Sequence, residues 1–215
     1  MHPIPPITVV AQGQGARPRW VVIDKPPGLL SVPGKDPELP NAQAWCRGAF
    51  AHAQGPITVH RLDMHTSGVL LLALDAEAHR ALSAQFARRE VEKTYTALVH
   101  GTPPHAEGTI DLPMRADITR RPLQIIDQTL GKPAQTTYRV LTHNAGTTRV
   151  EMVPHTGRSH QLRLHMATIA CPIVGDALYG PPGDPSPRLM LHARSLMFTD
   201  PDTGARITCT AEPAF

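Results

Sequence analysis

Short apolar runs separated by turn-forming residues dominate the hydrophobic pattern of this chain. Residues 20–24 are predicted to form the first strand, and residues 69–74 form an unbroken apolar run with the length of a buried strand. Glycine, proline and asparagine bound most of these runs, as is typical of strands that end in tight turns. The same pattern predicts further strands at 29–32, 93–100, 123–126, 134–141, 148–153, 189–192 and 206–210.

Three segments carry a helical pattern instead. Residues 42–51 are the first, and residues 76–89 follow Asp75, a good N-cap. Ser159 is placed to cap a third helix that runs to about residue 170. Strands therefore outnumber helices without strict alternation. The predicted class is α+β, with a long, mostly antiparallel mixed β-sheet flanked by helices and loops.

Composition adds domain organisation to this picture. Hydrophobic residues make up 41% of the 215 residues and charged residues 18%, which suits a folded globule with one sizeable core. Residues 1–19 are rich in proline, glycine and glutamine without periodicity, and are predicted to form a flexible N-terminal arm. A single catalytic or binding domain is expected over residues 20–215.

Net charge and cysteine content indicate which partners and which cellular compartment to expect. The net charge of +3 permits a polyanionic partner without requiring one. Cys46, Cys171 and Cys209 are odd in number and far apart, so they are predicted to be thiols in a reducing cytoplasm. The longest apolar run is too short to cross a bilayer, and the first residues lack a signal-peptide pattern. Neither export nor a membrane partner is expected.

Asp63 stands out because it is a carboxylate beside a turn within apolar surroundings. If residues 57–63 are extended, alternation places Arg61 and Asp63 on one face, so that a guanidinium and a carboxylate share a cleft wall. Asp63 could equally accept turn hydrogen bonds at a strand end. Taken singly, Tyr95 reads as a half-buried strand residue and Arg163 as a solvated helix charge.

Other chemistries find little support in the sequence. His155, His160 and His165 recur at steps of five, which neither a helix nor a strand presents to one metal ion. Ser67 lacks the G-x-S-x-G context of a hydrolase, and no phosphate-binding glycine pattern occurs. The sequence predicts neither a metal nor an organic cofactor.

Three ordered blocks carry a family resemblance: HRLDMHTSG at 60–68, KTYTALVHG at 93–101 and TGRSHQLRLHM at 156–166. Together with DKPPGLLSVPG at 24–34 and GDALYG at 175–180, they resemble the RluA-type pseudouridine synthases. Segments 107–113 and 131–136 are similar to the short branch of this family, without the S4-type domain of longer relatives. Asp24 departs from the asparagine that the family often has, and residues 119–124 differ in detail, which leaves substrate choice open.

The resemblance implies isomerisation of a uridine in RNA without cofactor or metal. It identifies Asp63 as the catalytic aspartate, Arg163 as its ion-pair partner and Tyr95 as the residue that packs on the target base. Arg61, with His60 beside it, matches the arginine that fills the gap left by a flipped nucleotide. Whether Asp63 attacks the sugar, attacks the base or removes a proton stays open.

RNA is the predicted partner, as a stem-loop of large-subunit ribosomal RNA, a transfer-RNA anticodon arm, or both. No obligate protein partner is inferred. The alternative is a non-catalytic RNA-binding or ribosome-assembly module, which would have no use for Asp63, Tyr95 and Arg163 together. Any single cation could also be a plain surface charge. The predicted RNA contacts are Arg158, His160, Arg120, Arg121 and Lys132, with Arg88, Arg89, Lys93 and Arg115 as further candidates.

Overall fold

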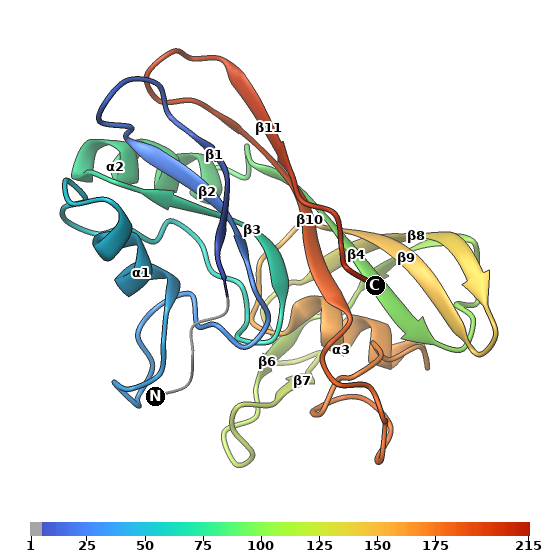
Figure 1. Cartoon of the computed structure of the whole chain (residues 1–215). Helices are drawn as coiled ribbons and strands as arrows, with labels where there is room; N and C mark the ends of the chain where they lie inside the picture. The colour runs from blue at the N-terminus through green and yellow to red at the C-terminus, as the bar shows by residue number, and fades with distance from the viewer. Residues whose placement is uncertain (1–5) are drawn as a thin grey trace. The chain divides into compact units, whose positions relative to one another are not determined.

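The computed structural model describes residues 6–215, which divide into two compact units (Figure 1). Unit 1 contains Met1–Lys93 and Ala193–Ala214, and unit 2 contains Thr94–His192 with Phe215. The chain passes from one unit to the other within two strands, β4 (Glu92–His100) and β10 (Leu191–Thr199). Residues 1–5 of the predicted flexible arm lie outside the described residues.

The sheet of unit 1 is built on its two most apolar strands. Every residue of β3 (Ser67–Ala73) is buried, and it pairs antiparallel with β2 (Trp20–Lys25) in a register that places Ile23 beside Leu70. Such continuous burial explains why both segments lack a polar alternation. The order is β1-β2-β3-β10, with β1 (Thr8–Gln12) at one side and β11 (Arg206–Thr210) paired to β10.

Two capped helices complete unit 1. Asn41 caps α1 (Ala42–Ala49) by accepting from the backbone N–H of Ala44. Asp75 caps α2 (Ala76–Ala87) by accepting from the N–H of Ala78, as the sequence predicted. Helix α2 packs on β3 through buried Ala78 and Leu82. The predicted first residues of these two helices are therefore confirmed, and in each a side-chain oxygen bonds an exposed N–H group of the first turn.

Unit 2 places one helix on an antiparallel sheet. The strand order is β4-β9-β8-β5, where β9 is Thr147–Pro154, β8 is Gln135–Asn144 and β5 is Glu107–Asp111. Helix α3 (Gln161–Thr168) packs on β8 and β9, with Leu162 and Met166 in the core beside Val150 and Met152 (Figure 1). A separate hairpin joins β6 (Met114–Ala116) to β7 (Gln124–Ile126).

The α+β class with a mostly antiparallel sheet is confirmed, but several predicted elements differ. Residues 29–32 form no strand, and Leu30 makes one isolated bridge to Asn41. Residues 57–63 are not a strand either, apart from a bridge between Thr58 and Leu72. The prediction of an extended segment was therefore wrong, and strand alternation gives no basis for placing Arg61 and Asp63 on one face.

Two further differences concern element ends. Strand β1 lies inside the segment predicted as a flexible arm, and it pairs with β2 across a bulge near Val9. The N-cap of α3 is His160, in the left-handed conformation at φ 56°, rather than Ser159. A left-handed cap is uncommon outside glycine, asparagine and aspartate, so the sequence pattern favoured the serine instead.

The three cysteines are free and buried. Burial raises the pKa of Cys46 to about 12 and that of Cys209 to about 11, so both thiols stay protonated at neutral pH. Within residues 6–215, no helix has the length and apolar character needed to cross a membrane.

Candidate functional site

Asp63 lies in a loop whose main chain is fixed on both sides. The hydroxyl of Ser31 accepts from the N–H of Leu62 at 3.0 Å and donates to the carbonyl of the same residue at 2.8 Å. Ser31 is buried, so this reciprocal pair satisfies two backbone groups that water cannot reach. The residue before Asp63 is thereby held by one side chain.

The residue after Asp63 is held by a buried lysine. The ammonium of Lys25 donates to the carbonyls of Met64, Leu29 and Pro26, and the N–H of Gly28 also donates to Met64. Burial lowers the pKa of Lys25 to about 7, against the opposing attraction of Asp63 and Asp24. Lys25 therefore lies close enough to Asp63 for their charges to interact, beneath a loop that it also ties together.

Gly68 closes this loop against β10. It has a φ of +110°, and a Cβ atom there would lie 2.2 Å from the carbonyl oxygen of Ala193. The N–H of Thr66 donates to the carbonyl of Asp63 at 3.1 Å. The turn after Asp63 consequently requires glycine, and the half-buried Asp63 side chain is carried on a tightly determined main chain.

His60 anchors the start of the same loop. Its Nε2 atom accepts from the N–H of Leu71 at 3.0 Å, and its ring stacks on Phe86 with centroids 4.6 Å apart. Burial, reinforced by the charge of Lys93, lowers the pKa of His60 to about 3, so the ring is neutral and acts as an acceptor. Arg61, the next residue, is exposed.

In unit 2, Arg163 is held by its guanidinium rather than its main chain. Nε and Nη2 donate to the two carboxylate oxygens of Asp176, each at 2.7 Å, and the two side chains are 5% and 0% exposed. Asp176 also accepts from the N–H groups of Leu178 and Tyr179. Considered without its motif, Arg163 was predicted to be a solvated charge on a helix. Its burial in a bidentate pair with Asp176 contradicts that alternative.

Tyr179 connects this ion pair to the start of α3. Its ring lies under the guanidinium of Arg163, 5.3 Å from the Cζ atom, and its hydroxyl bonds Nδ1 of His160 at 2.9 Å. The same hydroxyl accepts from the N–H of Gln124 in β7. A cation is thus fixed by a carboxylate at its edge and an aromatic ring at its face.

Tyr95 lies on β4 opposite Met152 and is half-buried at the edge of the unit 2 core. Unit 2 therefore contains a fixed guanidinium on α3 and an aromatic side chain on β4, while unit 1 contains the carboxylate. Among the described residues, no group of three or more histidine, cysteine, aspartate or glutamate side chains is placed to hold a metal ion. The chemistry that these residues offer is that of an anion, a fixed cation and an aromatic face.

Comparison with known proteins decides the family. A profile described as RNA pseudouridylate synthase matches residues 19–168. The dual-specificity RNA pseudouridine synthase RluA of Pasteurella multocida is 46% identical over 200 residues, covering 91% of this chain and 90% of the relative. The protein of the same name from Escherichia coli K12 is 44% identical over 199 residues, covering 91% and 90%. This chain belongs to the RNA pseudouridylate synthase family.

Solved structures agree with this family. Human RNA pseudouridylate synthase domain containing 1 superposes with a TM-score of 0.81 at 29% identity, covering 100% of this chain and 88% of that one. Human RNA pseudouridylate synthase domain containing 4 gives 0.74 at 25% identity, covering 95% and 88%. The resemblance drawn from the sequence blocks is confirmed, and membership of an isomerase family displaces the alternative of a non-catalytic RNA-binding module.

Five of the RNA contacts predicted for this pseudouridylate synthase family member lie in unit 2, whereas His60, Arg88, Arg89 and Lys93 lie in unit 1. Arg158 donates from Nε to the carbonyl of Pro133, and Arg120 donates from Nε to Asp117. Arg121 and Lys132 are exposed. His160 and His60 are both engaged with protein groups, so their roles toward RNA stay predictions.

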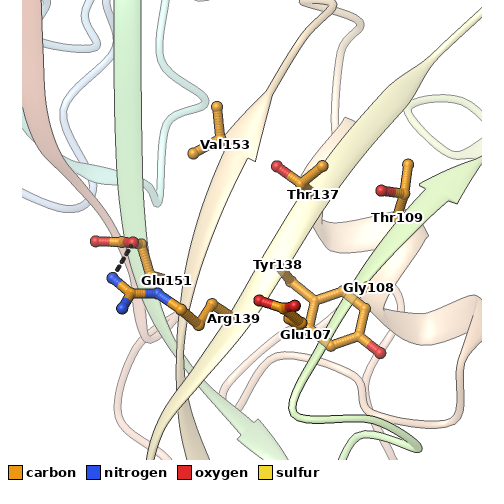
Figure 2. A pocket seen from close by; sticks show the side chains of 8 residues that line it. All are labelled: Glu107, Gly108, Thr109, Thr137, Tyr138, Arg139, Glu151 and Val153. Atoms are coloured by element: carbon orange, nitrogen blue, oxygen red, sulfur yellow. Dashed lines mark hydrogen bonds and ion pairs between the residues drawn. The ribbon is translucent and has the colours of Figure 1, made fainter.

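A hollow of about 450 Å³ lies on the strands β5, β8 and β9 (Figure 2). Glu107 and Glu151 line it, and Glu151 pairs with Arg139 at 2.8 Å. Two carboxylates disfavour a phosphate backbone there. None of the predicted site residues lines this hollow.

Sequence reasoning missed four residues that hold the site: Ser31, Lys25, Asp176 and Tyr179. All four lie inside blocks that carry the family resemblance, in LLSVPG, DKPPG and GDALYG. For Lys25 and Asp176, the presence of a charged residue within an apolar, turn-rich block could have been a signal; Ser31 and Tyr179 offered none. Each of them bonds at least one group that is distant along the chain: Lys25 bonds Met64, Ser31 bonds Leu62, Asp176 bonds Arg163 and Tyr179 bonds Gln124. No local pattern reveals such partners.

Proposed function

We propose that this chain converts specific uridines of structured RNA to pseudouridine, with Asp63 as the catalytic group. The observation that carries the proposal is the loop around Asp63, in which Ser31 bonds the main chain of the preceding residue and Lys25 that of the following one. A reactive carboxylate benefits from such preorganisation, because its position is then set before RNA binds. The reaction uses no metal or organic cofactor.

Arg163 and Tyr95 are the proposed partners of this chemistry. Following the family resemblance, Arg163 supplies the positive charge that keeps Asp63 ionised when RNA excludes water, and Tyr95 packs on the target base. The support from unit 2 is that Arg163 is already oriented by Asp176 and Tyr179, so its direction costs no ordering during catalysis. Arg158, His160, Arg120, Arg121 and Lys132 are proposed to contact the RNA.

The proposed substrate is a uridine in a stem-loop of large-subunit ribosomal RNA, of a transfer-RNA anticodon arm, or of both. Support comes from the relatives named dual-specificity RNA pseudouridine synthases, which match over nine-tenths of their length. We propose the cytoplasm as the place of action, in keeping with three free thiols in the chain.

The direct test is release of tritium from RNA whose uridines are labelled at the ring carbon that exchanges its hydrogen on isomerisation. The purified chain is expected to release label from a stem-loop and to keep doing so after exhaustive chelation. Binding of the stem-loop without release, at any enzyme concentration, would overturn the proposed activity. Activity lost on chelation and restored by a metal would overturn the cofactor-free mechanism alone.

Arg61 is proposed to enter the space left by the flipped uridine, with His60 anchoring the loop that carries it. Arg61→Ala is expected to slow an intact stem-loop strongly, and to slow less a substrate whose target uridine is already mispaired, since that base costs less to extrude. Single-turnover rates on the two RNAs give the ratio. Equal slowing on both RNAs would assign Arg61 to chemistry or phosphate binding instead.

A further inference from the structure

Two aliphatic side chains are far more exposed than any other large hydrophobic residue in the described part of the chain. Ile118 is 74% exposed and Leu130 is 71% exposed, whereas the next such residue, Val9, is 41% exposed. Both belong to turns next to the β6–β7 hairpin: Ile118 at its tip and Leu130 at its base. A large apolar side chain held in water is a candidate contact for a partner.

The tip that carries Ile118 is built by one buried aspartate. Oδ1 of Asp117 accepts from the N–H and hydroxyl of Thr119 and from the N–H of Arg120, and Oδ2 accepts from Nε of Arg120 at 2.8 Å. These bonds lower the pKa of Asp117 to about 2, so it remains ionised under all ordinary conditions. The exposure of Ile118 is therefore imposed by a determined turn.

The hairpin is fastened to the predicted catalytic arginine. The N–H of Gln124, at the start of β7, donates to the hydroxyl of Tyr179, whose ring lies under Arg163. In Figure 1 the loop between β6 and β7 extends away from α3. Within unit 2, the tip thus holds a fixed position with respect to Arg163.

Charge around the tip favours one kind of partner. Arg120 and Arg121 follow Ile118 by two and three residues, and the side chain of Arg120 is 69% exposed although it bonds Asp117. The carboxylate nearest to them in sequence, Asp117, is buried within the turn. An apolar group beside two cations matches the two surfaces of a nucleic acid, the faces of its bases and its phosphates.

We propose that Ile118 packs against an unstacked base of the RNA substrate while Arg120 and Arg121 contact flanking phosphates. The proposal rests on the proposed function, because it takes the RNA stem-loop as the partner. The apolar contact of Ile118 is not screened by salt, whereas the contacts of Arg120 and Arg121 with phosphates are. The salt dependence of RNA affinity can therefore distinguish the two kinds of contact.

The test is the affinity of a fluorescent stem-loop for the full chain across a series of salt concentrations. Ile118→Ala should weaken binding about tenfold by removing most of an aliphatic contact, and leave the slope of affinity against salt unchanged. Arg121→Gln should lower that slope by about 0.7 to 0.9. Leu130→Ala, with similar exposure in an aspartate-built turn at the other end of the hairpin, is the matched control and should bind as the wild type does.

Three outcomes would overturn the proposal. Equal weakening by Ile118→Ala and Leu130→Ala would point to a general surface effect, and no weakening by Ile118→Ala would remove the contact altogether. A changed salt slope in Ile118→Ala would mean that the substitution acts through the arginines. Failure of the proposed function has a different signature, since the wild-type chain would then bind the stem-loop without isomerising it.

Discussion

The loop around Asp63 and the surroundings of Arg163 are held in opposite ways. Ser31 and Lys25 bond the carbonyls and N–H of the residues on either side of Asp63, so the main chain is fixed. Asp176 and Tyr179 instead fix the guanidinium of Arg163 itself. The comparison teaches that the loop of Asp63 is held by bonds to its main chain, whereas the side chain of Arg163 is part of the packing of its unit.

This difference predicts the largest loss of stability at Asp176. Asp176→Asn leaves the buried cation of Arg163 without its counter-charge, which should lower the free energy of unfolding by about 3–5 kcal/mol. Denaturant unfolding measures the change. The control is Glu151→Gln, which breaks a pair with Arg139 whose side chains are 21% and 61% exposed, and should cost about 1 kcal/mol at most. Equal costs for the two variants would remove the distinction drawn for Arg163.

A smaller stability loss, with a larger effect on turnover, is expected at Ser31. Ser31→Ala leaves the N–H and carbonyl of Leu62 without their buried partner, at a cost of about 1–3 kcal/mol. Because the loop then holds Asp63 less accurately, the turnover rate should fall about tenfold to hundredfold while RNA affinity stays near that of the wild type. Ser83→Ala, on helix α2 of the same unit, is the control. A loss of RNA affinity in place of turnover would contradict the positioning role.

The effect at His60 is the smallest of the three near neutral pH and grows as the pH falls. The folded chain keeps His60 neutral down to about pH 3, whereas the unfolded chain protonates it near its ordinary pKa of 6.5. The free energy of unfolding should therefore fall as pH drops from 6.5 toward 3, since the unfolded state binds the extra proton. His60→Gln keeps an acceptor for the N–H of Leu71 and should reduce this fall. His52→Gln, another half-buried histidine of unit 1, is the control, and an unchanged fall in His60→Gln would refute the assignment.

The sequence predicted those parts of the fold that depend on local physics. Buried runs such as 69–74 and the cap at Asp75 were found because burial and capping leave a pattern within a few residues. The segment 57–63 defeated the same reasoning. It looks extended, but Ser31 bonds the backbone of Leu62 and the N–H of Leu71 bonds the side chain of His60, in place of a regular strand ladder. Both partners lie in other blocks of the chain.

The candidate site also contains features that local sequence could predict and features that it could not. Asp63, Tyr95 and Arg163 were selected from motifs, because a resemblance transfers residues position by position. The burial of Arg163 against Asp176 and the left-handed cap at His160 depend on contacts between distant segments, which no spacing expresses. The motifs did not identify the residues that hold Asp63 and Arg163 in place.

The most direct test of the account is single-turnover tritium release by Asp63→Asn on a stem-loop, measured together with its RNA affinity and its unfolding curve. Because the loop is fixed through its main chain, the variant should fold and bind RNA nearly as the wild type does and yield no product. Appreciable product would contradict the catalytic assignment of Asp63. Loss of folding would show instead that its carboxylate serves the turn.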